Sequence, residues 1–411
     1  MYTPELNFTD WRIIMKIIKL SIATMGVLFF TNSASAIEMT DYKVIEGTYQ
    51  EAYLNGALTV EGGNQDQTSY NGHIDANMKS IQTSAPYSIE YGVTANSDFF
   101  RGADDANGSE NGYDATAYGR FDKYLYNDDT VFLYGSTDLG YRKTATADDA
   151  DDPFVKVGAG VGYGRMYDAT PLAVAIRIVD DLKEYKIIKK PVSDEGMVAL
   201  AKVIDLEDEY ESKYGFNDYK KYWYTDMEKA LKDSGAIDSD SVGTFGIVRI
   251  NEIIDLERIS GRFHGWKVRG GLGQIISNYD GKSESTTADA EFQYGLPIGY
   301  ESQFTERATI SKILDDDEAI DYQFRNTMSY TYEIADRIDW ENSWLLGFDK
   351  YNAGDDVTTN SLSTGFRYYL ANRLTFDTTL SLTKTDGNNG KSVETPDWDS
   401  KFFMGVRYRL K

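Results

Sequence analysis

Apolar and polar residues alternate one by one near the C-terminal end of this chain. Between Ile320 and Ile334, every second residue is apolar or aromatic except Asn326, and the residues between them are polar. The alternation returns over residues 374–382 and 402–410. Because strand side chains point alternately to the two faces, each segment predicts a long strand with one apolar and one polar face. Repeated strands of this kind favour a barrel whose outer surface meets lipid.

Period-two patterning covers residues 48–168 and 261–411 and predicts an all-β, antiparallel transmembrane β-barrel. We expect about 14 strands, with a range of roughly 12 to 16, because the ends of predicted strands are uncertain. The predicted strands are 51–62, 68–82, 86–100, 112–126, 130–144, 154–166, 262–278, 285–296, 301–314, 319–335, 337–351, 356–370, 373–385 and 397–410.

Residues 170–260 instead follow a period of 3.6 and predict four helices. Thr170 and Pro171 are typical of an N-cap followed by proline at the first helical position, and Ser193 precedes the second helix. The expected organisation is therefore a first barrel part over 37–168, an inserted four-helix domain over 169–261 and a second barrel part over 262–411.

The first 36 residues have the pattern of a leader. Lys16 and Lys19 precede a short apolar stretch from Ile22 to Phe30, and Ala34-Ser35-Ala36 has the small residues of a cleavage site. We expect a signal peptide cleaved after Ala36.

Composition narrows the class further. No segment after residue 36 has the roughly 18 consecutive apolar residues of a membrane helix. The absence of cysteine excludes disulfides, thiolate metal sites and a cysteine nucleophile. Without residues 1–36 the chain keeps 39 basic and 64 acidic residues, a net charge of −25. With no basic patch visible, we expect no nucleic-acid partner.

The connections between predicted strands alternate in length. Long, often acidic segments follow the odd-numbered strands, and tight turns follow most even-numbered ones. Long loops outside and short turns inside are typical of outer-membrane barrels. If the chain starts in the periplasm, an even number of strands precedes the helical insert, which is then a periplasmic domain.

With its leader, its period-two segments and its last strand, the chain resembles Gram-negative outer-membrane β-barrel proteins. Proteins of that superfamily usually end in a strand with alternating hydrophobic residues and a terminal aromatic residue, a pattern that the assembly machinery reads. The alternation is matched here by Phe402, Met404, Val406, Tyr408 and Leu410, but the chain ends in Lys411 and not in phenylalanine. The resemblance implies the bacterial outer membrane as location. It also implies membrane lipid, lipopolysaccharide and the barrel assembly machinery as partners.

Charged residues of both signs fall on positions that face the barrel lumen. They either line a water-filled pore or pair into a network that plugs it; if water fills the lumen, the net acidity favours cations modestly. The lumen-lining candidates are Lys267, Arg269, Asp289, Glu291, Arg307, Asp321, Arg325, Glu333, Asp339, Glu341, Asp377, Arg407 and Arg409.

The sequence contains few residues that could form a catalytic or metal-binding site. His73 falls on a lumen position and could act as a base, whereas His264 is expected in an interfacial girdle. Neither has an identifying serine or aspartate motif beside it. In the acidic segment that begins at Asp104, Gly108 is not at the position where an EF-hand loop requires glycine. We therefore expect no enzyme, no cofactor and no metal site.

Two local patterns carry expectations about packing. Glu306 falls on the lipid face of its strand, which predicts a bulge or a different register there. Glycines at 158, 160, 162 and 164 predict a flat inward stripe against which something packs closely, the helical insert being one candidate.

The favoured function is an outer-membrane, porin-like pore for ions or small solutes, with the helical domain at its periplasmic mouth. The alternative is a docking or assembly protein of the envelope or of exopolysaccharide export. It would bind a periplasmic partner through residues 170–260.

Overall fold

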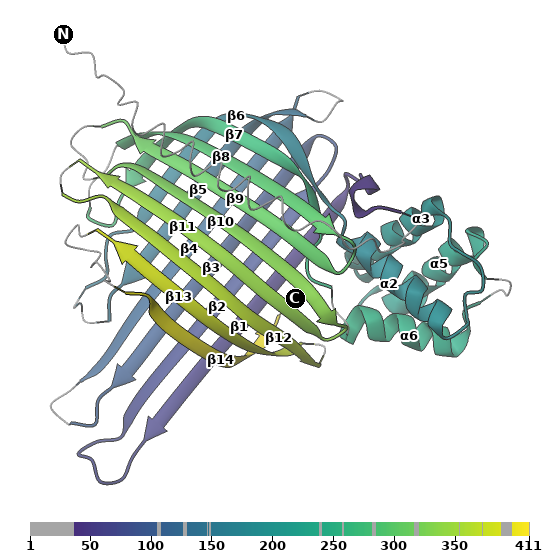
Figure 1. Ribbon diagram of the computed structural model, residues 1–411, viewed down its shortest axis with the longest axis horizontal. Helices are drawn as coiled ribbons and strands as arrows, with labels where there is room; N and C mark the ends of the chain where they lie inside the picture. The colour runs from purple at the N-terminus through teal and green to yellow at the C-terminus, as the bar shows by residue number, and fades with distance from the viewer. Residues whose placement is uncertain are drawn as a thin grey trace. The chain divides into compact units, whose positions relative to one another are not determined.

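The computed structural model describes residues 37–410, except 105–107, 126–129, 146, 148, 238–240, 257–258, 282–284, 316–319, 353, 372 and 388–396. Its strands form one closed antiparallel barrel in which each pairs with its sequence neighbours and β1 meets β14 (Figure 1). The strands are β1 (Gly47–Glu61), β2 (Ser69–Thr83), β3 (Tyr87–Arg101), β4 (Ser109–Tyr124), β5 (Val131–Lys143), β6 (Phe154–Asp168), β7 (Phe263–Ser277), β8 (Ser285–Ile298), β9 (Ser302–Ile313), β10 (Ile320–Ala335), β11 (Ile338–Tyr351), β12 (Val357–Ala371), β13 (Leu374–Asp386) and β14 (Asp399–Arg409).

The sequence prediction of an antiparallel barrel with 14 strands is confirmed. Large apolar side chains such as Val161, Leu272 and Phe402 are exposed on the outer face, as in a barrel that contacts acyl chains. The closed barrel and its apolar outer face agree with the fold that the resemblance implies.

The helical insert lies between β6 and β7. Its helices are α2 (Thr170–Glu184), α3 (Asp194–Asp205), α4 (Glu207–Tyr214), α5 (Tyr219–Asp233) and α6 (Gly243–Leu256), so the insert has five helices among the described residues and not the predicted four. The additional helix, α4, has no buried residue, and its sequence therefore carries no apolar stripe. None of the described helices is long and apolar enough to cross a membrane.

Local capping follows the sequence in part. Ser193 accepts a hydrogen bond from the Gly196 backbone at 3.1 Å, as an N-cap should. Thr170 instead lies within α2, and its backbone N–H and hydroxyl both donate to Asp168. The helix therefore begins one residue earlier than a Thr170 cap predicts.

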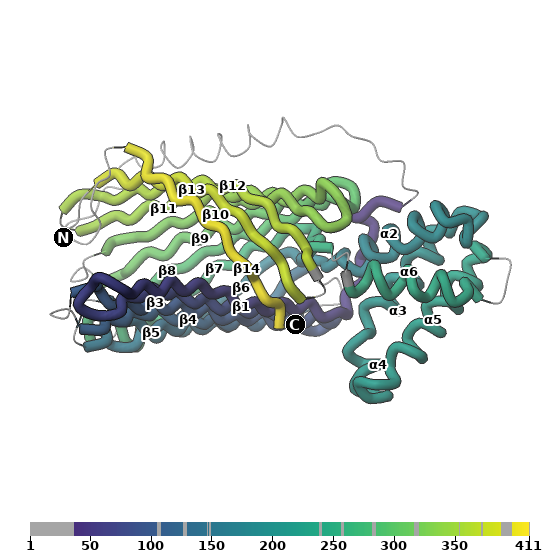
Figure 2. The backbone as a smooth tube through the Cα atoms, turned by 90° about the horizontal axis from the view of Figure 1, so that it is seen from below, coloured from purple at the N-terminus to yellow at the C-terminus, as the bar shows by residue number. Residues whose placement is uncertain are grey.

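The two ends of the barrel differ. The chain enters β1 and leaves β14 at the end that carries the insert, the helical-domain end, and the longer connections lie at the other, the long-loop end (Figures 1 and 2). A short 3-10 helix, η1 (Met39–Asp41), also lies at the helical-domain end, and Met39 and Tyr42 are buried in the core of the insert. The α2 side chains Leu172, Ile178 and Leu182 are fully buried in that core.

A buried ion pair attaches the insert to the barrel. The Arg177 guanidinium of α2 contacts the Glu333 carboxylate at the end of β10, and both side chains are buried. Arg262, which immediately precedes β7, is also fully buried and donates to the backbone oxygen of Tyr300 at 2.8 Å. Polar contacts thus hold the helices against the rim of the barrel.

The expectation of a bulge or shifted register at Glu306 is wrong. Strand β9 pairs in regular register with β8 and β10, and Glu306 faces outward like its ladder partners Tyr294 and Met328. Its carboxylate instead accepts a hydrogen bond from the Asn326 side chain at 3.2 Å.

Candidate pore constriction in the barrel lumen

Strand β7 brings two basic side chains to the centre of the lumen. Its neighbours Trp266 and Val268 face outward and are exposed, so Lys267 and Arg269 point inward, where both are buried. The sheet thus holds two cations away from solvent, which is favourable only if carboxylates lie beside them.

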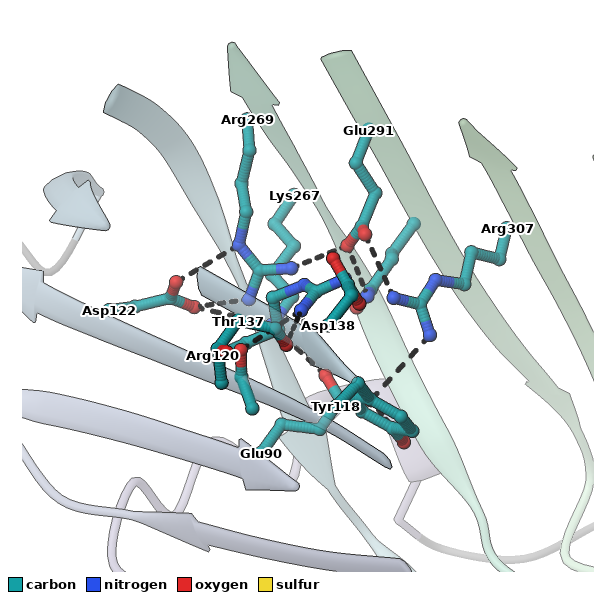
Figure 3. Close-up of polar contacts among 12 residues, drawn as sticks. Glu90, Tyr118, Arg120, Asp122, Thr137, Asp138, Lys267, Arg269, Glu291 and Arg307 are labelled. Atoms are coloured by element: carbon teal, nitrogen blue, oxygen red, sulfur yellow. Dashed lines mark hydrogen bonds and ion pairs between the residues drawn. The ribbon is translucent and has the colours of Figure 1, made fainter. Parts of the chain in front are cut away.

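Asp122 of β4 is the first of these carboxylates. It accepts hydrogen bonds from Arg269 Nε at 2.9 Å and Nη2 at 2.7 Å, and from Lys267 Nζ at 3.3 Å (Figure 3). Its side chain is only 1% exposed. The fork of the arginine and the carboxylate match in a bidentate pair, the strongest geometry for such a contact.

A second carboxylate, Glu291 of β8, continues the network. It contacts Arg269 on one side and accepts a hydrogen bond from Arg307 Nη2 of β9 at 2.8 Å on the other. Arg307 Nη1 then lies 3.9 Å from Glu90 of β3, which is also 3.9 Å from Lys267 Nζ. The Tyr118 hydroxyl donates to Glu90 at 3.3 Å.

The contact between Arg307 and Glu90 crosses the interior of the barrel. Strands β3 and β9 are separated by five strands in the sheet order, so their side chains can meet only by reaching across the lumen. The central network, which we define as Glu90, Asp122, Lys267, Arg269, Glu291 and Arg307, therefore narrows the lumen at this level (Figure 3). It has three acidic and three basic members.

The glycines of β6 have a role in this narrowing. Gly160 and Gly162 face the rings of Tyr134 and Phe132 on β5, and a Cβ atom at either glycine would overlap a ring. The stripe therefore packs against β5 side chains and not against the helical insert. Phe132 is fully buried, and its ring centre lies 6.0 Å from the Arg269 guanidinium.

A chamber of about 490 Å³ lies between the central network and the helical-domain end. Its inward-facing charged residues are Glu51, Glu90, Asp168 and Glu341 with Lys79, Arg165, Lys267, Arg307 and Arg367. A second cavity of about 280 Å³ continues between the barrel rim and the insert, because both cavities share Tyr49, Asp168 and Ser260 as lining residues. The space beside the network thus extends to the side of the helices.

The other sequence candidates lie outside the central network. Near the long-loop end, Arg325 contacts Asp349 at 2.7 Å, Asp289 contacts Lys156 at 2.7 Å and Asp321 contacts Lys312 at 3.1 Å.

A further group gathers near the helical-domain end, around Arg367 of β12. Arg367 contacts Glu341 at 2.6 Å and Asp377 at 3.0 Å, and Asp377 also contacts Arg407 at 3.2 Å. Asp339 accepts from the Tyr369 hydroxyl at 2.9 Å, Glu333 pairs with the insert, and Arg409 lines the second cavity.

The sequence candidates came entirely from the second half of the barrel and missed two of the six members of the central network. Glu90, Asp122 and Lys156 were absent from them, and so was Arg367. The alternation of side chains that placed Lys267 on the inner face of its strand also places Glu90 and Asp122 on the inner face. The sequence of the first half of the barrel therefore carried the same signal.

The two histidines have different surroundings. His73 lies on the inner wall, 2.7 Å from Asp98 and 3.0 Å from Asp75. His264 is not in an exposed girdle, because it is buried with its Nε2 atom 2.6 Å from the Tyr42 backbone oxygen and stacks on Tyr167. Within the described part of the chain, no cluster of three potential metal ligands occurs.

Comparison with known proteins assigns no family to this chain. No family model matches, and no curated protein sequence matches. Among solved structures, the chain is similar to the COG4313 outer membrane channel from Pseudomonas putida F1, with a TM-score of 0.33, 9% identity and coverage of 91% of this chain and 98% of that one. The chain is also similar to OmpT, an outer membrane protein of Vibrio cholerae, with a TM-score of 0.33, 9% identity and coverage of 88% of this chain and 97% of that one. For CdiB from Acinetobacter baumannii the TM-score is 0.36 and the identity 8%, with coverage of 89% of this chain and 60% of that one. At these TM-scores no functional conclusion follows.

Proposed function

We propose that this protein is an outer-membrane channel for ions or small polar solutes, in which the central network is the constriction. The observation that carries the proposal is the charged chamber of about 490 Å³ directly beside the network inside a closed barrel. Rings of charged side chains at a narrow point are a common means of selecting what passes through a pore.

The charge of the lumen bears on selectivity. The central network has equal numbers of acids and bases, and the inward-facing lining of the chamber has four acidic and five basic residues. The strong net acidity of the chain therefore lies largely elsewhere. We expect weak selectivity between anions and cations in place of the modest cation preference that composition favours.

Conductance across a planar lipid bilayer tests the channel. The variant Glu90→Gln/Arg307→Gln removes one acid and one base and releases the contact across the lumen. We expect its unit conductance to rise about twofold, because the narrowest point loses its fixed ion pair.

The matched control is Arg325→Gln/Asp349→Asn. It also removes one acid and one base, but from a pair on the neighbouring strands β10 and β11. Its conductance should equal that of the unchanged protein. A correctly folded protein that never conducts would refute the channel.

We further propose that the helical domain lies in the periplasm and that residues 1–36 are removed on export. Six strands precede the insert, and both ends of the described chain lie at the helical-domain end. Single cysteines at Asn64 and at Lys229 test this orientation with a membrane-impermeant maleimide. On intact cells Asn64 should react and Lys229 should not, and the reverse pattern would contradict the topology.

A second candidate function, docking of a periplasmic partner, is favoured by one surface of the insert. Tyr185 at the end of α2 and Phe245 and Val248 of α6 are about half exposed, and the two rings lie 5.1 Å apart. A photo-crosslinking residue at Phe245 should capture one defined protein in cells, whereas the same residue at exposed Lys229 should not. Equal capture at both positions would argue against this function.

A further inference from the structure

The barrel is closed by a short seam. Strand β1 pairs with β2 over all 15 of its residues, but it pairs with β14 only through Tyr53, Leu54 and Asn55. One further hydrogen bond, from the Leu410 N–H to the Ala52 oxygen at 2.8 Å, lies at the helical-domain end of the seam. The neighbouring β13–β14 ladder has ten residue pairs by comparison.

Beyond these pairs, each strand has an edge without a partner strand among the described residues. Residues 56–61 of β1 are paired only with β2, and residues 399–406 of β14 only with β13. All six residues from Gly56 to Glu61 are exposed, including the inward-facing Ala57 and Thr59. Strands β1 and β14 meet near the helical-domain end and diverge toward the long-loop end, so the seam opens as a wedge (Figure 2).

An open edge is costly at membrane depth. Backbone N–H and C=O groups that face hydrocarbon without a partner lose several kcal/mol each, which is why membrane barrels normally close completely. Water in the lumen or a bound molecule must therefore cover residues 56–61 and 399–406.

The chemistry of the two sides of the wedge differs. On the outer side, β1 carries Leu58 and Val60 and β14 carries Phe402 and Met404, and each of the four is about 60% exposed. They are among the most exposed apolar side chains of the barrel. An acyl chain lying along this edge would contact apolar groups from both strands.

On the inner side the wall changes from apolar to polar. The Phe403 ring of β14 lies over Gly405, where it leaves a flat apolar surface next to the opening. On β2, His73 pairs with Ala57 and contacts Asp98 and Asp75. A molecule that enters through the wedge therefore passes from apolar edges to hydrogen-bonding groups.

We propose that this wedge is a lateral opening through which a single-chain amphiphile moves between the membrane and the long-loop half of the lumen. Its acyl chain would lie against Leu58, Met404 and Phe403, and its polar head group would lie toward His73. The central network narrows the path along the barrel axis, whereas the wedge lies beside the long-loop half of the lumen. The inference does not depend on axial conduction.

The geometry favours an amphiphile over an added β-strand. A strand that pairs with both edges needs them at a constant separation of about 10 Å, twice the spacing between neighbouring strands. The edges of β1 and β14 instead converge on the Asn55–Arg407 pair. A flexible acyl chain fits a wedge of changing width, whereas a strand could pair with one edge only.

The test uses lysophosphatidylcholine with a photoactivatable group at the end of its acyl chain, in vesicles that contain the full barrel. We expect the probe to label Phe403 and Ala57 on the inner wall. In Thr59→Trp the indole fills the opening, so labelling of Phe403 should fall severalfold. The matched control is Thr116→Trp, because Thr116 is an exposed inward-facing threonine of β4, away from the seam.

Cysteine pairs measure the opening itself in this cysteine-free chain. Leu54→Cys/Tyr408→Cys spans a paired position and should form a disulfide readily on mild oxidation. Leu58 and Met404 would lie opposite one another if the same register continued along the seam. The variant Leu58→Cys/Met404→Cys should therefore form a disulfide far more slowly. All variants are first checked for folding by their heat-dependent gel mobility.

Any one of three results would overturn the inference. The first is equal disulfide formation by both cysteine pairs, which would mean that the seam is closed along its length. The second is labelling that is confined to outward-facing residues or is unchanged by Thr59→Trp. The third is a crosslink of the Leu58 edge to a strand of another protein in cells, which would exclude the amphiphile as occupant.

Discussion

The Phe132 ring of β5 lies directly against the Cα atom of Gly162 on β6, so that a Cβ atom at residue 162 would overlap the ring and would lie 2.7 Å from the Val268 backbone oxygen. The ring is fully buried and lies beside Arg269 of the central network. A missing side chain on one strand thus makes room for a large one on the next.

We expect Gly162→Ala to lower the free energy of unfolding by about 1–3 kcal/mol, because overpacking must displace the ring or the backbone. Urea unfolding in lipid vesicles, followed by tryptophan fluorescence, measures the change. Gly135→Ala on β5 is the control, since nothing lies within 4 Å of the added Cβ atom. Equal effects of the two substitutions would contradict the close packing.

Asp122→Ala should be more damaging. It leaves Arg269 and Lys267 buried without their shared carboxylate, and removal of one partner from a buried ion pair typically costs about 3–5 kcal/mol. Asp138→Ala, which removes a carboxylate that is 35% exposed and pairs with Arg120, should cost about 1 kcal/mol or less. The same unfolding measurement compares them, and a smaller loss for Asp122→Ala would show that the network is not held as described.

The Glu306–Asn326 pair on the outer face predicts a non-additive double substitution. Asn326→Leu alone leaves the Glu306 carboxylate on an apolar surface without its hydrogen bond and should cost about 1–3 kcal/mol. Glu306→Leu/Asn326→Leu should be nearly neutral or stabilising, because both polar groups then leave the lipid-facing surface. A double-mutant cycle measures the coupling, and simple additivity would argue against the pair.

The pH dependence of the helical domain should reflect Asp205 at the end of α3. Burial, and then the nearby Asp168, Glu209 and Asp208 carboxylates, raise the pKa of Asp205 to about 7. A raised pKa means that the folded state favours the protonated acid. The stabilising contribution is therefore complete below the ordinary pKa of 3.8 and is lost as the pH rises through about 7.

Chemical denaturation followed by near-ultraviolet circular dichroism should then show a more stable domain at pH 5 than at pH 8. Asp205→Asn should flatten this dependence, whereas Asp194→Asn, at the exposed start of the same helix, should leave it unchanged. A dependence that survives Asp205→Asn would assign it to other groups.

The sequence by itself determined the strands, because a strand with one lipid face must alternate at every second position. All 14 predicted strands are present, and most predicted ends fall within two or three residues of the observed ones. The same alternation places Lys267, Arg269, Glu291 and Arg307 on the inner face, where all four meet in the central network. It did not reveal α4, because a helix without a buried face leaves no apolar stripe.

Only the tertiary structure decided which charges meet. Arg307 and Glu90 are more than 200 positions apart in the chain. The alternation along a strand shows on which face a side chain lies, but not how far across the lumen it reaches. The tertiary structure also decided the seam, because the register between the first and last strands depends on how the whole sheet closes. Alternation fixes the two faces of each strand locally, whereas closure and the pairing of lumen charges depend on the barrel as a whole.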